Sequence, residues 1–214
     1  MTDYPLPNVS NDLSGQVALV TGTTSGLGKR FARVLAACGA KVAITGRRVE
    51  RLEELATELR DSGATVEPIA LDMRDNDSIL ACVDQAGKAL GTVTVLVNNA
   101  GIPDAQRAHK MNNELIDDVF DTNLRGPYVL SCEIARRLIA AELPGRMVNI
   151  SSVGAFNYSG QGAALYSITK AGIIRMTEAL AVEWARFNIN VNAIAPGAFA
   201  SEMMDGMLDR MGDI

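Results

Sequence analysis

The chain has 214 residues, of which 48% are hydrophobic and 21% charged, and its formal net charge is −5. This length and balance suit one globular α/β domain and exclude a disordered or fibrous chain. Because the net charge is negative and no segment is rich in Lys or Arg, the composition argues against general binding to nucleic acid or to an anionic membrane.

Cysteine usage and the N-terminal segment favour a cytoplasmic protein. The three cysteines, Cys38, Cys82 and Cys132, are odd in number and far apart in the sequence, which favours reduced thiols. The single histidine, His109, lies in a polar segment without clustered cysteines, so we expect a surface histidine and no metal site. The polar residues 1–15 do not resemble a signal peptide, and no apolar run reaches the roughly 18 residues of a membrane span.

Strand and helix patterns alternate along the chain after a short arm at residues 1–15. Apolar runs rich in β-branched residues predict strands that are buried on both faces, and apolar residues at helical spacing predict amphipathic helices. The predicted strands are residues 16–21, 41–45, 65–71, 93–98, 146–150 and 190–194, and the predicted helices are residues 26–38, 49–61, 77–90, 112–141 and 165–187. This alternation implies right-handed crossovers and a parallel sheet with helices on both faces. No linker interrupts the pattern, so residues 1–214 are interpreted as one domain.

Glycines and small polar residues gather where the predicted strands end. The segments are TGTTSGLG, TGRR, LDM, NNAG, ISSVG and APGAF. In an open parallel sheet, ligands bind beyond the carboxyl ends of the strands. The pattern therefore predicts one ligand that lies across this edge of the sheet.

The first of these segments, TGTTSGLG at residues 21–28, joins a strand to a helix. Its glycines would allow a pyrophosphate to approach the backbone N–H groups and the helix N-terminus. The expected contacts are Gly22, Thr24, Ser25, Gly26, Leu27 and Gly28. A plain strand–helix turn remains an alternative. A P-loop loses its main support, because it would require Gly at position 23 and Ser or Thr at position 30, where the chain has Thr23 and Arg30.

The second segment, TGRR at residues 45–48, occupies the place where a dinucleotide site selects its adenosine ribose. An acidic residue there would bind a free 2′-hydroxyl, whereas Arg47 or Arg48 would form charge-assisted hydrogen bonds with a 2′-phosphate. The segment therefore favours NADP over NAD. In the alternative, the two arginines only begin a solvated helix and pair with Glu50 or Glu53.

Tyr166 and Lys170 are four residues apart at the start of a predicted helix, so they share one face. A nearby ammonium is expected to lower the pKa of a phenol from its usual value of about 10, which suits proton exchange with an alcohol or a carbonyl. Upstream, Pro127 has no N–H to donate to the carbonyl of Asn123. That carbonyl is expected to hold a water within reach of Lys170; in the alternative, the proline only kinks the helix.

Taken together and in this order, the motifs resemble those of the short-chain dehydrogenase/reductases over nearly the whole chain. The matching segments are TGTTSGLG, LDM, NNAG, TNLRG, NISS, YSITK and APGAF. The resemblance implies a Rossmann-type, doubly wound sheet of strand order 3-2-1-4-5-6 and oxidoreduction with NADP or NAD. It also implies catalytic roles for four residues: Tyr166 as general acid/base, Ser152 as hydrogen-bond donor to the substrate oxygen, Lys170 as ligand of the nicotinamide ribose, and Asn123 as anchor of a proton-relay water. Further cofactor contacts would come from Asp72, Met73, Asn99, Ala100, Gly101, Pro196, Gly197, Phe199 and Ser201.

Three features depart from the family pattern. Ser152 lies one residue farther from Tyr166 than is usual, which a one-residue insertion in the intervening loop would explain; Ser151 is the fallback, although strand alternation would point it the other way. Ser201 stands where the family usually has Thr. The sequence ends at Ile214, before the family's usual further helix and seventh strand, so residues 201–214 are interpreted as the start of a truncated substrate-covering segment.

The expected function is hydride transfer between nicotinamide C4 and a ketone or secondary alcohol. No charge cluster marks the expected substrate region, which favours an uncharged or partly apolar substrate. A non-enzymatic dinucleotide-binding regulator is the main alternative, although such a protein would not need the proton-relay residues. An epimerase or dehydratase of the same superfamily is disfavoured by the compact length and the APGAF segment. The resemblance further implies a homodimer or homotetramer formed through the two long helices.

Overall fold

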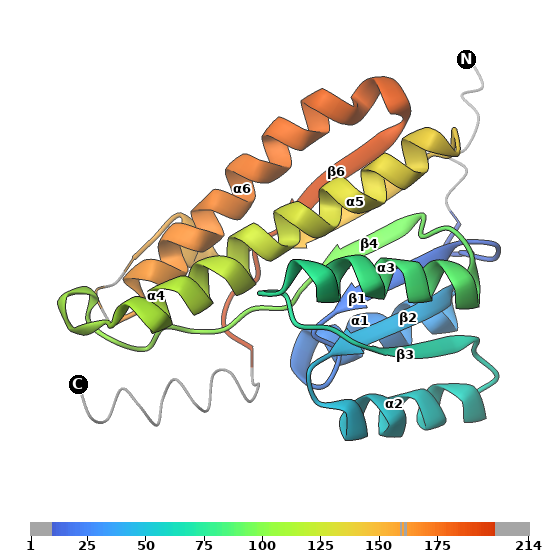
Figure 1. Ribbon diagram of the computed structural model, residues 1–214, viewed down its shortest axis with the longest axis horizontal. Helices are drawn as coiled ribbons and strands as arrows, with labels where there is room; N and C mark the ends of the chain where they lie inside the picture. Colours follow the sequence, from blue (N-terminus) through green and yellow to red (C-terminus); the bar gives the residue numbers. More distant parts are fainter. Residues whose placement is uncertain (1–9, 159, 161, 200–214) are drawn as a thin grey trace, which may run out of the picture.

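The computed structural model describes residues 10–158, 160 and 162–199, which build one six-stranded parallel sheet flanked by helices (Figure 1). The strands are β1 (Val17–Thr21), β2 (Lys41–Gly46), β3 (Val66–Ala70), β4 (Val95–Asn98), β5 (Gly145–Ile150) and β6 (Ile189–Ile194). The α-helices are α1 (Gly26–Ala37), α2 (Val49–Asp61), α3 (Asn76–Leu90), α4 (Asn113–Phe120), α5 (Gly126–Ala140) and α6 (Ala164–Trp184). Shorter helical turns are η1 (Ala108–Lys110), the π-helix η2 (Asp121–Arg125), η3 (Val153–Ala155) and η4 (Ala185–Phe187).

The strand order is β3-β2-β1-β4-β5-β6, so the predicted sheet topology is confirmed. The order reverses between β1 and β4, which are hydrogen-bonded neighbours although two strands separate them in the sequence. At such a reversal the connections leave to opposite faces of the sheet and open a crevice at the carboxyl ends of the strands. The fold therefore places a ligand-binding crevice where the glycine-rich segments gather.

Two apolar layers, one on each face of the sheet, explain why the strands are hydrophobic throughout. Along β1, Leu19 faces the layer formed with α3, α5 and α6, whereas Ala18 and Val20 face the layer formed with α1 and α2. Because successive side chains point to opposite faces, a strand covered on both sides has no position for a solvated residue. All five residues of β1 are buried.

The predicted long helix at residues 112–141 is interrupted, and the interruption has a local cause. Helices α4 and α5 are joined by η2, in which the N–H of Gly126 donates to the carbonyl of Asp121, five residues earlier. Pro127 has no N–H for the regular bond to the carbonyl of Asn123. In addition, a Cβ on Gly126 would lie 2.3 Å from the carbonyl oxygen of Met73, so only glycine allows the two backbones to come this close. The bulge leaves Asn123 buried beside the crevice.

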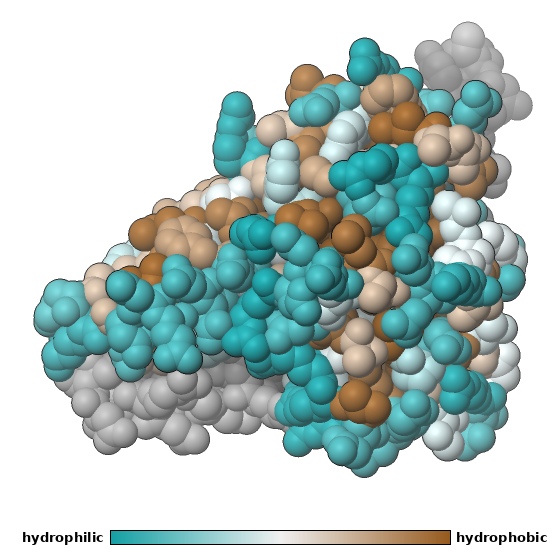
Figure 2. All heavy atoms as spheres, in the orientation of Figure 1, coloured by the Kyte–Doolittle hydropathy of each residue, from teal (hydrophilic) through white to brown (hydrophobic). Residues whose placement is uncertain are grey.

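The outer face of the long helices mixes apolar and polar side chains (Figure 2). A shallow groove there is lined by Phe120, Asp121, Leu124, Arg125, Tyr128, Met176, Ala179, Leu180 and Glu183. Oligomerisation through this face stays a prediction. His109 is exposed, as expected, whereas residues 1–9 and 201–214, which include Ser201 and the expected substrate cover, lie outside the described residues. Among the helices that the structure describes, none combines the length and hydrophobicity needed to span a membrane.

Candidate active site

A cavity of about 720 Å³ lies at the carboxyl ends of the strands and brings together most of the predicted site residues. Those that line it are Gly22, Thr24, Ser25, Gly26, Leu27, Arg47, Arg48, Asp72, Met73, Asn99, Ala100, Gly101, Ser152, Tyr166, Lys170, Pro196, Gly197 and Phe199. Gly28 and Asn123 do not line it but support residues that do. The cavity thus runs from the glycine-rich loop and the arginines to the tyrosine and lysine of α6.

The glycine-rich loop has backbone positions that only glycine satisfies. Gly22 and Gly26 have φ angles of +71° and +53°, in the left-handed region that other residues rarely adopt. A Cβ on Gly28 would lie 2.1 Å from the carbonyl oxygen of Gly22, so the first turn of α1 packs directly on the loop. The N-terminal N–H groups of α1 are consequently presented to the cavity, in the arrangement that binds phosphate.

Thr21, which sequence reasoning did not single out, joins the glycine-rich loop to the NNAG segment. Its buried hydroxyl oxygen accepts hydrogen bonds of 2.9 Å from the N–H groups of Asn99 and Ala100. In return, Nδ2 of Asn99 donates to the carbonyls of Thr21 at 2.9 Å and Gly22 at 3.2 Å. The loops after β1 and β4 therefore form one rigid unit across the point where the strand order reverses.

At the same end of the cavity, Arg48 lies beside the glycine-rich loop. Its Nη2 donates to Oγ1 of Thr24 at 2.6 Å and to Oγ of Ser25 at 3.3 Å, and its Nε donates to the same Thr24 oxygen at 3.1 Å. Arg47 also lines the cavity. The guanidinium of Arg48 is thus held beside the hydroxyls of two residues that were predicted to contact phosphate.

Asp72 belongs to a charged network that the sequence did not reveal. Arg74 donates to both carboxylate oxygens of Asp72, with its shortest contact of 2.7 Å from Nη2, and reaches Asp118 of α4 at 2.8 Å through Nη1. The hydrogen bond from Arg74 is the main cause that lowers the pKa of the Asp72 carboxyl, and the charge of Arg47 adds to it. Asp72 is therefore held as an anion in the part of the cavity that Arg47 and Arg48 line.

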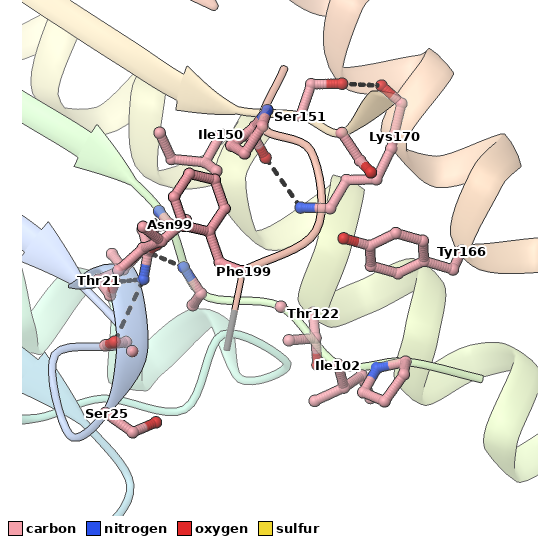
Figure 3. A pocket seen from close by; sticks show the side chains of 18 of the residues that line it. Thr21, Ser25, Asn99, Ile102, Thr122, Ile150, Ser151, Tyr166, Lys170 and Phe199 are labelled. Atoms are coloured by element: carbon pink, nitrogen blue, oxygen red, sulfur yellow. Dashed lines mark hydrogen bonds between the residues drawn. The ribbon is translucent and has the colours of Figure 1, made fainter. Parts of the chain in front are cut away.

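Tyr166 and Lys170 lie close together on one wall of the cavity (Figure 3). Ser152 lines the same cavity. Nζ of Lys170 lies 5.5 Å from the centroid of the Tyr166 ring and donates a 2.8 Å hydrogen bond to the carbonyl of Ile150. The side chain of Ser152 lies near enough to the Tyr166 phenol to act on its pKa. Ser151 is turned the other way, and its hydroxyl donates to the carbonyl of Lys170 at 2.8 Å. Of the two serines, the geometry therefore places Ser152 beside the phenol.

Burial controls the protonation of Tyr166 and Lys170. It raises the pKa of the Tyr166 phenol, and the charge of Asp104 raises it further, while the hydrogen bond with Ser152 acts in the opposite direction. The expected lowering of the Tyr166 pKa by Lys170 is therefore wrong for the free protein. The physical reason is that burial penalises both charged forms, and it also lowers the pKa of the Lys170 ammonium to about 8.

Asn123 supports the wall from behind. Its Oδ1 accepts from the N–H of Ile102 at 2.8 Å, and its Nδ2 donates to the carbonyl of Ile102 at 2.9 Å and to Oγ1 of Thr169 at 3.3 Å. A Cβ on Gly101 would lie 3.3 Å from Oδ1 of Asn123 and 3.5 Å from Nζ of Lys170. The side chain thus fixes the loop after β4, while the expected water on its backbone carbonyl stays a prediction.

The buried lysine makes the stability of the free protein depend on pH. Between pH about 8 and the unfolded value near 10.5, the unfolded chain binds more protons, so the free energy of unfolding should rise with pH. Below pH 8 the stability gained from neutral Lys170 is lost. Between pH about 8 and 10.5, the free energy of unfolding of the wild type should rise by on the order of 3 kcal/mol relative to that of Lys170→Met. Denaturant titrations at several pH values measure the difference, and the exposed Lys88→Met is the control. A difference between wild type and Lys170→Met that does not change with pH would contradict the prediction.

Comparisons with known proteins agree with this architecture. A family model described as short chain dehydrogenase matches residues 16–211. The 3-oxoacyl-acyl-carrier-protein reductase of Rickettsia prowazekii is 37% identical over 200 residues, which cover 93% of this chain and 79% of that protein. Gluconate 5-dehydrogenase of Gluconobacter oxydans is 32% identical over 196 residues, which cover 92% of this chain and 76% of that protein. The chain therefore belongs to the short-chain dehydrogenase family.

Solved structures show the same likeness in three dimensions. A variant of actinorhodin polyketide ketoreductase, crystallised with NADPH, is 36% identical with a TM-score of 0.88, and the match covers 92% of this chain and 76% of that one. A gluconate 5-dehydrogenase from Burkholderia cenocepacia, in complex with NADP and tartrate, is 31% identical with a TM-score of 0.86, over 93% of this chain and 77% of that one. These relatives are oxidoreductases, which agrees with the class predicted from the sequence.

Proposed function

We propose that the protein is an NADP-preferring dehydrogenase/reductase that interconverts a ketone and a secondary alcohol, with Tyr166 as general acid/base. The observation that carries this proposal is the meeting of Tyr166, Ser152 and Lys170 on one wall of a cavity whose other end is formed by the glycine-rich loop and Arg48. One elongated cavity thus joins residues suited to proton transfer to residues suited to phosphate binding.

The residues of the cavity fit a nicotinamide dinucleotide. The space that a Cβ on Gly22 or Gly28 would fill is taken by the neighbouring backbone, so the loop turns tightly and presents the N-terminus of α1. Arg48 and Arg47 would hold a 2′-phosphate, and Asp72 and Met73 would border the adenine. When bound, the cofactor would supply the hydride. Two structures similar to this chain contain NADPH or NADP, which supports the preference.

The side chains on the catalytic wall have separate tasks in the proposed reaction. The hydroxyls of Ser152 and Tyr166 would hydrogen-bond the substrate carbonyl oxygen and polarise it, and Tyr166 would donate the proton. Burial, which raises the pKa of Tyr166, keeps the phenol protonated near neutral pH, the form that donates the proton in reduction. Lys170 would hold the nicotinamide ribose, and Asn123 would anchor the water that returns a proton.

The test of this proposal is a coupled measurement of binding and turnover. Addition of NADPH should quench the tryptophan fluorescence of the purified protein or stabilise it against unfolding. The protein should also consume NADPH when uncharged ketones are supplied. Tight NADPH binding without turnover of any ketone or secondary alcohol would favour the non-enzymatic regulator instead.

The same proposal includes a homodimer or homotetramer formed through α5 and α6, and a cytoplasmic location. Sedimentation measures the oligomeric state.

Substitution of the arginines should separate the two cofactors. We expect Arg48→Gln to raise the Kd for NADPH about 10- to 100-fold, because a charge-assisted contact with the 2′-phosphate is lost, and to leave the Kd for NADH nearly unchanged. Fluorescence titration with both cofactors measures this. Arg33→Gln, which removes an arginine that pairs with Glu58 outside the cavity, is the charge-matched control. An equal loss for both cofactors would contradict the prediction, and a larger selective loss in Arg47→Gln would assign the contact to Arg47.

A further inference from the structure

Helix α6, which carries Tyr166 and Lys170, begins without a capping side chain of its own. Its N-cap residue is Ala163, with φ −129° and ψ 34°, and an alanine has no side-chain acceptor for the first N–H groups. Gly160 and Gly162, which precede it, have positive φ angles of 82° and 71°. The approach to the helix is therefore built from residues that do little to fix where the first turn lies.

A carboxylate from a distant part of the chain supplies the missing cap. Oδ2 of Asp104 accepts hydrogen bonds from the N–H groups of Leu165 at 2.8 Å and Tyr166 at 3.2 Å, while its Oδ1 accepts from the N–H of Ala105 at 3.0 Å. Asp104 is only 1% exposed. A buried carboxylate satisfied by backbone N–H groups at a helix N-terminus is stabilised both by these bonds and by the helix dipole.

The loop that carries Asp104 is itself anchored on both sides. It follows the NNAG segment, which is joined to Thr21. The side chain of Asn123 accepts a hydrogen bond from the N–H of Ile102 and donates one to its carbonyl. Beyond Asp104, Ala105 has a left-handed φ of +47°, a conformation that is costly for a residue with a Cβ. Such a backbone persists only where surrounding contacts enforce it, and here it accompanies the Asp104 hydrogen bonds.

We propose that Asp104 is the positioning residue for Tyr166, holding the first turn of α6 against the loop after β4 so that the phenol stands beside Ser152 at the cavity wall. The tie is made at the backbone N–H of Tyr166 itself, so any movement of the carboxylate moves the catalytic residue. Through the same loop, the position of the phenol is linked to Asn123 and to the glycine-rich loop. The kinetic part of this inference rests on the proposed function.

The charge of Asp104 also acts on the reaction. The groups that face the phenol are the charged Asp104 of the loop, the uncharged Ser152 just after β5, and Lys170 one turn along α6, whose Nζ lies 5.5 Å from the ring centroid. A carboxylate near the phenol disfavours the phenolate and raises the pKa of Tyr166. Removal of this charge should therefore lower that pKa and move the Tyr166-dependent limb of the pH profile for alcohol oxidation to lower pH.

Hydrogen exchange tests the positioning role without any need for activity. In Asp104→Ala, the amides of Leu165 and Tyr166 should exchange about 10- to 100-fold faster than in the wild type, because hydrogen bonds to a charged acceptor are lost. In Asp104→Asn the exchange rates of these amides should lie between those of the wild type and of Asp104→Ala. The single carbonyl oxygen of asparagine cannot accept from both the helix and Ala105. Asp12→Asn is the matched control, because Asp12 also accepts a backbone N–H, that of Ser14, but lies before β1 and outside the cavity.

Kinetics on the same variants test the link to catalysis. Both Asp104 variants should lose about 10- to 100-fold in kcat with little change in the Kd for NADPH, as expected when a reacting group is displaced by about 1 Å. Asp104→Asn should also shift the pH profile downward, which a purely structural role would not do. If the alanine variant does not fold, the isosteric asparagine variant decides both tests.

The outcomes separate this inference from the proposed function. Wild-type exchange at Leu165 and Tyr166, or unchanged kcat and pH profile in Asp104→Asn while Tyr166→Phe is inactive, would overturn the role of Asp104 and leave the proposed function intact. If the wild type binds NADPH but turns over no substrate, the proposed function fails. Faster exchange in the Asp104 variants would even then support the positioning of Tyr166.

Discussion

Replacing Tyr166 by phenylalanine is expected to lower kcat by about 10²- to 10⁴-fold while the Kd for NADPH stays within a few-fold of wild type. The ring remains to fill its place in the cavity wall, but the hydroxyl that exchanges the proton with the substrate oxygen is gone. Because this hydroxyl lies beside Ser152, its loss also removes one of the two groups that would polarise the carbonyl. The loss should therefore be almost entirely in the chemical step.

Single-turnover measurement of NADPH oxidation, with cofactor binding titrated separately, would check this result. Tyr158→Phe is the matched control, because Tyr158 lines the same cavity but is about half exposed, at 51%. The control removes a phenol hydroxyl from the same cavity but keeps the Tyr166 hydroxyl beside Ser152 and Lys170. Near-wild-type turnover in Tyr166→Phe, or an equal loss in both variants, would refute the assignment of Tyr166 as general acid/base.

The second large effect is expected from Gly28→Ala in the first turn of α1. The new Cβ would lie 2.1 Å from the carbonyl oxygen of Gly22 and 2.4 Å from Nδ2 of Asn99. The first of these neighbours is backbone, so relief requires the glycine-rich loop to move away from the helix N-terminus. We expect the Kd for NADPH to rise about 100-fold or more, and overpacking to destabilise the fold by about 1–3 kcal/mol.

A second helical glycine provides the matched control for this substitution. Gly87 lies inside α3, and the nearest atom that its Cβ would meet is Nη1 of Arg137 at 4.0 Å. Gly87→Ala should therefore leave NADPH binding unchanged and raise the free energy of unfolding by up to about 1 kcal/mol, the usual gain of Ala over Gly in a helix. Denaturant titration and cofactor titration of both variants distinguish the two positions. Unaltered NADPH binding in Gly28→Ala would contradict the role given to the loop.

Positioning in this molecule depends largely on the segment Asn99 to Ala105. Its first residues are joined to Thr21 and Gly22 of the glycine-rich loop, Ile102 is held by Asn123, and Asp104 caps the helix of Tyr166. The glycine-rich end of the cavity and the wall that carries Tyr166 are therefore connected by one short stretch of backbone. Substitutions within this segment should disturb catalysis more than their distance from the reacting atoms would indicate.

The alternation of strands and helices could be read from the sequence because local patterns carry it. Strands buried on both faces are continuous apolar runs, helices repeat their apolar residues at helical spacing, and each glycine-rich turn follows a strand. The spacing of Tyr166 and Lys170 placed them on one helix face, and most predicted site residues line one cavity. Alternation of side chains along the strand also indicated correctly that Ser151 and Ser152 point in different directions.

Other features depended on contacts between segments that are distant in the sequence. The long helix predicted at residues 112–141 is divided by a π-helix, partly because Gly126 packs on the backbone of Met73. The salt bridge from Arg74 to Asp118 joins positions 44 residues apart. No local sequence pattern predicts such partners.

The sequence by itself determined the parallel αβ architecture, the glycine-rich loop and the tyrosine–lysine pair, since each depends on residues that lie close together in the sequence. Only the tertiary structure decided how the pair is held and protonated. Asp104 reaches the amide of Tyr166 from 62 residues away, and burial, rather than the neighbouring ammonium, controls the pKa of the phenol. Desolvation and long-range capping depend on the complete surroundings of a group, which exist only once the chain has folded.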